Sequence, residues 1–260
     1  MRPVIPPDRV AGLERAALRA WPASESESVC GWEVRFSDGF TKRANSVQPI
    51  GAAQCGLKEA VSGCEEWYAR RGRPCIFRLT PLTNPEVEPY LTEVGYRLLE
   101  PTSVMHLALR EVPEDPMLRE PDLEEWLSHF ARMSGMTDDP PRALGEIIQR
   151  IEPPRLLAAL HAKEVRHPVA CGMAVLENDR VGLFDLVTSP EHRRRGFGTE
   201  LVRALLGWGF AHGAREAYLQ VVRANVAAWS MYERLGFAFA YDYRYLIREL
   251  GAVPTFPEPA

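Results

Sequence analysis

The chain has 260 residues, of which 46% are hydrophobic, 25% charged and 9% aromatic. This composition is that of an ordinary globular protein and excludes a disordered or low-complexity chain. The formal net charge is −4, so the chain as a whole lacks the basic character that binding to DNA, RNA or anionic lipid requires. We therefore expect no nucleic-acid partner.

The N-terminal sequence MRPVIPPDRV contains no apolar segment of the kind found in a secretion signal. The longest apolar stretch, near Val169–Leu176, is far shorter than the roughly 18 residues of a membrane helix. We expect a cytoplasmic protein that does not bind a membrane.

The cysteines are odd in number and show neither a Cys-x-x-Cys pair nor a histidine at zinc-site spacing. They therefore predict buried free thiols in a reducing compartment, and no metal site. These five residues are Cys30, Cys55, Cys64, Cys75 and Cys171.

The first half of the chain offers two strand-like segments, Trp32–Phe36 and Phe40–Val47. The stretch Val112–Pro121 is rich in proline and acidic residues and has no periodic pattern, which is typical of a linker. Beyond it the pattern predicts two amphipathic helices followed by three strands. The helices are Leu123–Met133 and Pro141–Ile151, and the strands are Arg155–Ala162, Val169–Leu176 and Val181–Thr188.

The remaining elements alternate between helix and strand. Thr199–His212 has its apolar residues on one helical face, and Gly213 can end that helix. Glu216–Val222 predicts a strand, Val226–Leu235 a short helix and Phe239–Ile247 a closing strand. This order is that of an α/β fold, followed by a loose tail over residues 252–260.

The sequence near the end of the second half is similar to a segment of the first half. A shift of 141 residues aligns Pro49–Tyr96 with Pro190–Phe237 without a gap. The identities fall mainly at turns and helix ends, where backbone geometry restricts the choice of residue. They are Pro49, Glu59, Val61, Trp67, Gly72, Asn84 and Gly95 in the first copy. We expect two tandem domains, residues 1–112 and 113–251.

The segment from Arg193 to Thr199 predicts an anion site. It lies between a strand and a helix, so unpaired backbone N–H groups and the positive end of the helix dipole meet in one loop. Glycines let the backbone approach a ligand, and arginine side chains add charge-assisted bonds to phosphate oxygens. Taken alone, the run Arg-Arg-Arg-Gly is more typical of a solvated surface turn than of a binding site.

The wider context resembles the GNAT superfamily of N-acetyltransferases. The matching features are Arg193-x-x-Gly196-x-Gly198 before a long helix, and Asn225 with Tyr232 and Gly236 after the next strand. The resemblance implies two tandem GNAT-like domains, each a mixed, mostly antiparallel sheet flanked by helices. It also implies an enzyme that moves an acetyl group from acetyl-CoA to a primary amine.

The resemblance also implies where the co-substrate binds. The backbone of Leu186, Val187 and Thr188 would pair with the pantetheine arm as an added strand. Asn225 would contact the co-substrate beyond the pyrophosphate, and equally it can cap the following helix. The pyrophosphate would be held by the backbone amides of Arg193, Arg194, Arg195, Gly196, Phe197, Gly198 and Thr199.

Tyr232 is the expected catalytic residue, because a phenol can protonate the thiolate that a collapsing tetrahedral intermediate expels. The alternative is a packing role in the core. At Gln220 the chain departs from the relatives that acetylate protein amino termini, which have a glutamate there; a neutral amide cannot accept a proton. Asp185, Glu177 and His161 are the candidate bases, and the sequence favours none of them.

The first half lacks these groups. At the 141-residue shift, Ala52, Cys55, Leu57 and Leu91 occupy the positions of Arg193, Gly196, Gly198 and Tyr232. We expect a degenerate domain without turnover, which completes the other domain's sheet or shapes the acceptor cleft.

Two other functions remain open from the sequence: a non-catalytic acyl-CoA-binding or sensing protein, and a scaffold. The acceptor is equally open among polyamines, amino acids, aminoglycosides and protein amino termini, because variable loops build acceptor pockets. The oligomeric state and other acyl donors are also open.

Overall fold

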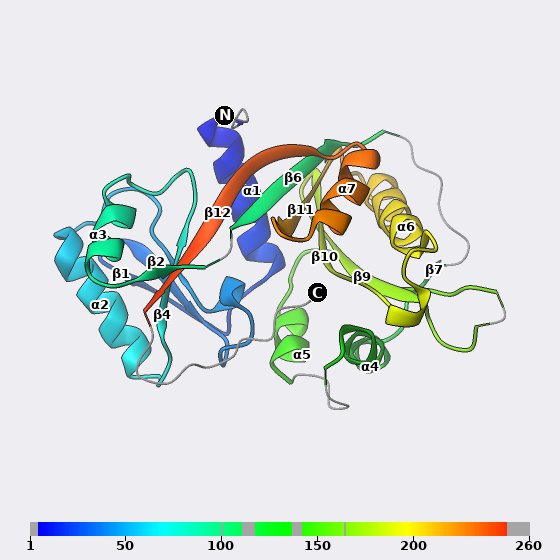
Figure 1. The fold of residues 1–260 in the computed structure, drawn as a ribbon, viewed down its shortest axis with the longest axis horizontal. Helices are drawn as coiled ribbons and strands as arrows, with labels where there is room; N and C mark the ends of the chain where they lie inside the picture. Colours follow the sequence, from blue (N-terminus) through cyan, green and yellow to red (C-terminus); the bar gives the residue numbers. More distant parts are fainter. Residues whose placement is uncertain (1–4, 100, 111–117, 137–141, 164, 249–260) are drawn as a thin grey trace.

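The computed structural model describes residues 5–99, 101–110, 118–136, 142–163 and 165–248. Within these ranges one mixed sheet of 12 strands runs through both halves of the chain, with helices packed on its faces (Figure 1). Its strand order is β1-β2-β3-β4-β12-β6-β11-β10-β9-β8-β7, and β5 pairs with β12 off this path. The α/β class with a mixed sheet flanked by helices is therefore confirmed.

The first half contributes helices α1 to α3 and strands β1 to β6. In chain order they are α1 (Pro7–Ala20), β1 (Glu25–Val29), β2 (Trp32–Phe36), the 3₁₀ turn η1 (Lys42–Ala44), β3 (Val47–Gln48), α2 (Leu57–Ala69), β4 (Cys75–Leu79), α3 (Val87–Glu93), β5 (Arg97–Leu98) and β6 (Thr102–Ala108). Sequence analysis assigned nothing before Trp32. Yet α1 carries Pro7 in its first turn and buries Val10, Leu13 and Ala20 at helical spacing.

The expected strand Phe40–Val47 is wrong. Most of this segment is a loop around η1, and β3 begins only at Val47. The buried side chain of Asn45 holds the loop: its Oδ1 accepts from the N–H groups of Ser37 (2.8 Å) and Gly39 (3.0 Å), and its Nδ2 donates to the carbonyls of Phe40 and Thr41, each at 2.8 Å. Such local side-chain bonds replace the bonds of a strand ladder.

In the second half the predicted elements are confirmed, with ends that move by a few residues. They are α4 (Leu123–Ser134), α5 (Arg142–Gln149), β8 (Arg155–Leu160), β9 (Ala170–Glu177), β10 (Arg180–Thr188), α6 (Phe197–Ala211), β11 (Glu216–Val222), α7 (Val226–Arg234) and β12 (Ala238–Arg248). A short β7 (Leu118–Arg119) and the 3₁₀ turn η2 (Pro190–His192) are additional. Most of the expected linker and the whole tail, residues 252–260, lie outside the described residues.

Helices cover both faces of the second-half sheet. Along β9, Met173 and Val175 pack in the core that contains α1 and α4, while Ala174 and Leu176 pack in the core that contains α6. Because both faces are buried, the strand is apolar along its whole length instead of alternating with polar residues. In the described part of the chain, no helix is long and apolar enough to cross a membrane.

The two halves correspond in element order but exchange their last strands. Parallel β3–β4, with α2 between them, matches parallel β10–β11, with α6 between them. The strand β6 ends the first half yet pairs with β11, and β12 ends the second half yet pairs with β4 and β6. A single sheet thus takes the place of the two separate sheets expected, and the domain boundary near residue 112 stays a prediction.

A buried ion pair joins the helix α1 to β4, and a hydrogen bond joins it to β12. Arg78 of β4 donates from both terminal nitrogens to the carboxylate of Glu14, and the Tyr241 hydroxyl donates to Glu14 Oε1 at 2.6 Å. The Arg78 guanidinium also stacks on Tyr243, 3.8 Å from the ring centroid. Both charged side chains are almost completely buried, at 4% and 2% exposed, so each depends on the other for compensation.

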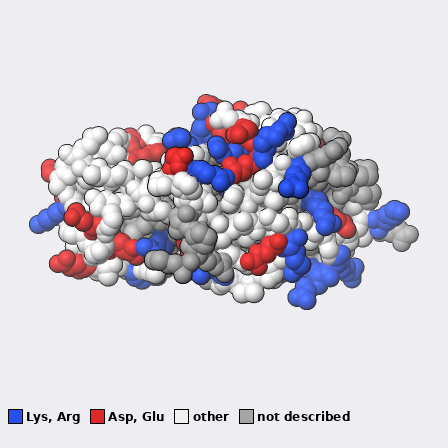
Figure 2. Space-filling view, turned by 90° about the horizontal axis from the view of Figure 1, so that it is seen from above, with Lys and Arg blue, Asp and Glu red and all other residues white. Residues whose placement is uncertain are grey.

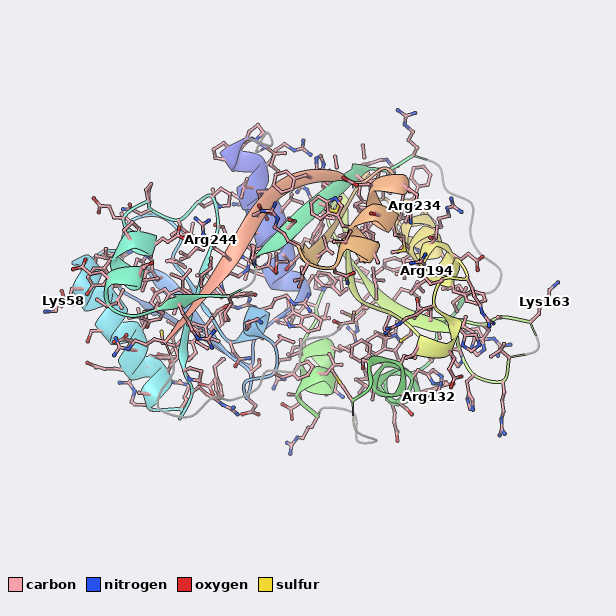
Figure 3. All side chains as sticks on the ribbon, in the orientation of Figure 1. Lys58, Arg132, Lys163, Arg194, Arg234 and Arg244 are labelled. Atoms are coloured by element: carbon pink, nitrogen blue, oxygen red, sulfur yellow. A yellow bond between two sulfur atoms is a disulfide. The ribbon has the colours of Figure 1, made fainter. Side chains whose placement is uncertain are left out.

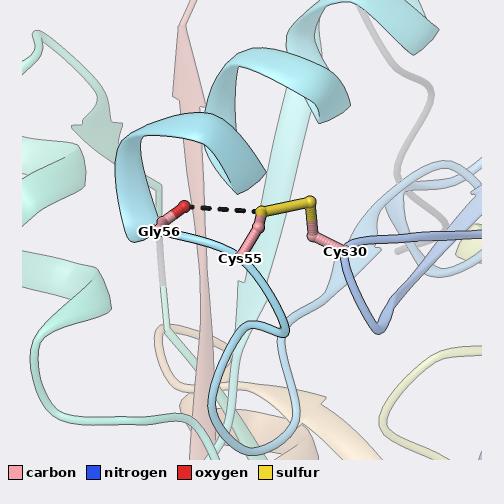
Figure 4. Close-up of a disulfide and its surroundings, with 3 residues drawn as sticks. All are labelled: Cys30, Cys55 and Gly56. Atoms are coloured by element: carbon pink, nitrogen blue, oxygen red, sulfur yellow. Dashed lines mark hydrogen bonds between the residues drawn. A yellow bond between two sulfur atoms is a disulfide. The ribbon is translucent and has the colours of Figure 1, made fainter.

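The expectation of five free cysteines is wrong for two of them. Cys30 and Cys55 form a disulfide with Cα atoms 5.6 Å apart (Figure 4). The turn between β1 and β2 brings Cys30 to the loop before α2, a proximity that spacing along the chain does not show. Cys64, Cys75 and Cys171 are buried free thiols, as expected.

We predict that Glu14→Ala lowers the free energy of unfolding by about 3–5 kcal/mol, because it leaves the Arg78 charge buried without a counter-ion. Urea unfolding of the purified variant measures this. The double variant Glu14→Leu with Arg78→Met removes both charges and should recover most of the loss. A loss below about 1 kcal/mol in the single variant would contradict a role for the pair in joining these elements.

Candidate functional site

The candidate site is a cavity of about 1010 Å³ at the point where β10 and β11 separate. These parallel strands pair from Arg180 with Glu216 to Leu183 with Leu219, and the pairing ends there. Beyond that point both strands continue as walls of the cavity, from Asp185 to Thr188 on β10 and from Gln220 to Val222 on β11.

The β10 wall offers an open strand edge. Its register with β9 shifts between Phe184 and Val187, and Asp185 within this bulge has a φ of +50°. The other edge of β10 stays bonded to β9 through Val187 and Thr188. Leu186, Val187 and Thr188 line the cavity, and the edge of β10 that β11 no longer pairs with lies at this position.

The loop before α6 closes one end of the cavity. Gly196 has a φ of +90°, a conformation that favours glycine, and no side chain caps the helix that begins at Phe197. Among the described residues, no backbone carbonyl accepts from the N–H groups of Phe197 and Gly198. A Cβ on Gly198 would lie 3.3 Å from Thr188 Oγ1 and 3.4 Å from Met231 Sδ, so glycine permits this close approach.

Six of the seven loop residues expected to bind line the cavity; the exception is the exposed Arg195. The Nε of Arg193 lies 3.4 Å from the Thr188 carbonyl oxygen. Arg194 and Arg234 both line the cavity, and Figure 3 shows them at the same end of the molecule, near α6 and α7. This end is therefore rich in positive charge and backbone donors.

Both residues expected on or before α7 line the cavity. Asn225 caps the helix, because its Oδ1 accepts from the Ala228 N–H at 3.1 Å. Tyr232 is 6% exposed and packs edge-on against Phe237, with ring centroids 5.9 Å apart. Burial raises the pKa of Tyr232 above that of a free phenol, so the hydroxyl keeps its proton at neutral pH. Tyr232 therefore both packs in the core and lines the cavity.

The far end of the cavity combines residues from both halves of the chain. Thr41, Lys42 and Arg43 come from the η1 loop, and Tyr243 and Tyr245 from β12. Sequence analysis missed these residues; no motif marks them, and Arg43 lies 142 residues before the Asp185 that it contacts. Gln220 of β11 also faces the cavity and accepts from the Tyr243 hydroxyl at 2.7 Å.

Of the three candidate bases, Asp185 is the one in the cavity lining. Its side chain is 2% exposed, and its Oδ1 lies 3.4 Å from a terminal nitrogen of Arg43. Its Oδ2 has no hydrogen-bond partner among the described residues. Burial raises the pKa of Asp185 to about 6, and the Arg43 charge opposes that rise.

The other two candidate bases lie elsewhere. Glu177 pairs with Arg19 at 3.2 Å, and His161 follows the end of β8. Neither of them lines the cavity.

On the face that Figure 2 shows, charged side chains of both signs occur, and neither sign covers the whole face. Acidic and basic groups are mixed over its middle, and basic groups gather toward the right-hand end, where the second half lies. Within the described residues, no group of three or more histidine, cysteine or acidic side chains is placed to hold a metal ion.

Comparison with protein families gives a match over residues 9–246, to the family described as "Probable histone acetyltransferase Rv0428c C-terminal". A similar curated protein is the "Uncharacterized N-acetyltransferase YobR" of Bacillus subtilis, 26% identical over 253 residues that cover 93% of this chain and 99% of the relative. Streptothricin acetyltransferase of Streptomyces lavendulae is 31% identical over 134 residues, which cover 51% of this chain and 63% of the relative.

Solved structures agree on the fold. A GCN5-related N-acetyltransferase from Kribbella flavida has a TM-score of 0.69 at 17% identity, covering 93% of this chain and 96% of its own. A tandem GNAT protein from the clavulanic acid biosynthesis pathway has a TM-score of 0.65 at 12% identity, covering 97% and 91%. With a family match along most of its length, the chain belongs to the Rv0428c C-terminal family and is a GNAT-type N-acetyltransferase.

Proposed function

We propose that the chain transfers the acetyl group of acetyl-CoA to a primary amine at one site, in its second half. The observation that carries this proposal is the convergence on one cavity of an open strand edge, an uncapped helix N-terminus and a buried tyrosine. These are the groups expected to hold an extended amide chain, a diphosphate and a departing thiolate, respectively.

The residues present fit acetyl-CoA. The N–H groups at the start of α6 and the arginines before it suit the pyrophosphate. The edge of Leu186 to Thr188 suits the amides of the pantetheine arm, which adds to the sheet as a strand would. Asn225 lies in the same wall and can contact the co-substrate while capping α7. When bound, acetyl-CoA supplies an activated thioester.

Tyr232 acts as the general acid in this proposal. A phenol is protonated at neutral pH, and burial, which raises the pKa of Tyr232, does not change this. Tyr232 therefore has a proton to donate to the sulfur as the tetrahedral intermediate collapses. The packing against Phe237 restricts the ring, and a fixed donor is more effective because it needs no reorganisation at the moment of reaction.

Asp185 acts as the general base. An amine with a pKa near 10 must lose a proton before it attacks a thioester, and Gln220 cannot accept one. Asp185 lines the cavity, its buried Oδ2 has no hydrogen-bond partner among the described residues, and its pKa is about 6. It is therefore ionised at neutral pH, while its conjugate acid is strong enough to pass the proton on.

The first half is, in this proposal, a degenerate copy without turnover of its own. Cys55, at the position of Gly196, is held in the disulfide with Cys30, and Leu91 at the position of Tyr232 is buried. The matching order of elements supports a tandem origin, and the likeness to a tandem GNAT protein supports it at the level of the fold. The η1 loop of this half supplies one wall of the acceptor end.

We predict that Tyr232→Phe lowers kcat on the order of 10²-fold while the Kd for acetyl-CoA stays within about twofold, because the variant removes a proton donor and little else. The assay follows thiol release and acetylated product over a panel of amines. Tyr218→Phe is the matched control, a buried tyrosine outside the cavity lining. An unchanged kcat across the pH range would remove the role assigned to Tyr232.

We predict that kcat/KM of the wild type falls as the pH drops through about 6, because protonation of Asp185 removes the base. In Asp185→Asn this limb of the pH profile is lost and the rate above pH 7 is on the order of 10²-fold lower. Glu177→Gln, outside the cavity, should keep the wild-type profile. If Asp185→Asn keeps it as well, another group is the base.

A further inference from the structure

The acceptor is open, since the name of the family refers to a histone and that of one relative to streptothricin. We infer that the acceptor is a small zwitterion, an amine with a carboxylate a few bonds away, as in an amino acid. The inference rests on the proposed function. Its basis is the arrangement of Arg43 and Asp185 at the far end of the cavity.

Arg43 is a fixed cation in the cavity wall. Its guanidinium lies over the ring of Trp21, 4.2 Å from the centroid, and 5.7 Å from that of Phe184. Trp21 is itself held, because its indole N–H donates to Thr41 Oγ1 at 3.0 Å. A guanidinium is planar and can bind a carboxylate in a bidentate manner, and stacking on Trp21 holds its plane in one orientation.

The loop that carries Arg43 is rigid as well. The side-chain amide of Asn45 bonds to backbone groups on both sides of η1. Since the amide is fully engaged in the loop, Arg43 reaches the cavity from a preorganised turn. Little conformational entropy is then lost when a ligand binds to its guanidinium.

Arg43 and Asp185 present opposite charges side by side. Their contact is a single bond of 3.4 Å among the described residues, at the long end for a charged pair. The single contact leaves other guanidinium N–H groups of Arg43 for a ligand, and the buried Asp185 Oδ2 has no partner among the described residues. An amine that gives its proton to Asp185 therefore lies next to the Arg43 guanidinium. A carboxylate a few bonds from that amine would bind to Arg43.

The positive charge of Arg43 opposes a polycation at this end. Its guanidinium lies in the cavity wall beside the carboxylate of Asp185, where the amine reacts. A polyamine or a lysine-rich peptide would bring further positive charge next to this guanidinium, which costs binding energy. A zwitterion brings an anion and a cation in matching positions.

The test compares amino acids with the amines left after their decarboxylation: lysine with cadaverine, histidine with histamine, and phenylalanine with phenethylamine. For each pair, kcat/KM is measured with acetyl-CoA in the wild type, Arg43→Gln and Arg43→Lys. The ratio within a pair cancels effects on folding, on co-substrate binding and on Asp185. Arg19→Gln, an exposed arginine outside the cavity, is the matched control.

We expect at least one amino acid to exceed its amine by about tenfold to a hundredfold in the wild type, as a charge-assisted hydrogen bond provides. Arg43→Gln should bring that ratio close to one, Arg43→Lys should keep part of it, and Arg19→Gln should keep all of it.

Decarboxylated amines or a lysine-rich peptide as the better acceptors would overturn the inference and leave acetyl transfer intact, as would a preference that survives Arg43→Gln. Failure of the wild type to bind acetyl-CoA in calorimetry, with no product from any amine, would instead overturn the proposed function.

Discussion

The site depends on an exchange of strands between the two halves of the chain: β6, the last strand of the first half, and β12, the last strand of the second half, each pair with strands of the other half. Because β12 pairs with both β4 and β6, and β6 with β11, the sheet runs without interruption from one half of the chain to the other. This places the η1 loop of the first half beside the bulge of β10 in the second. Without this exchange, Arg43 would have no means of reaching Asp185, and the cavity would lack the wall that carries Tyr243 and Tyr245.

Two buried charge pairs near the exchanged strands differ in what they are suited to do. Glu14 and Arg78 bond through both terminal nitrogens of the arginine, and Tyr241 occupies a further position on the carboxylate. That pair is satisfied and structural. Arg43 and Asp185 share one long bond, and an oxygen of Asp185 has no partner among the described residues. An incompletely satisfied pair in a cavity costs stability, and such a cost is typical of a functional site.

Most elements of the second half could be predicted, because the spacing of apolar residues and the glycines that end helices are features of short segments of sequence. The elements α6, β11, α7 and β12 lie where the sequence placed them. The loop residues, Asn225 and Tyr232 could likewise be found from a motif. The strand Phe40–Val47 failed because Asn45 bonds its own loop, and the disulfide and Arg43 were missed because they depend on contacts between distant segments. Strand order is non-local in the same way, so a repeat in the sequence could not reveal the exchange of strands.

We propose that acetyl-CoA binds to one half of the chain only, at the start of α6. Calorimetric titration of acetyl-CoA into the full chain, with Gly198→Asp alongside, tests it most directly. That substitution puts a side chain and a negative charge where a Cβ alone would already crowd Thr188 and Met231. We predict one site per chain, which the variant loses. Two sites, or a single site that survives the substitution, would contradict it.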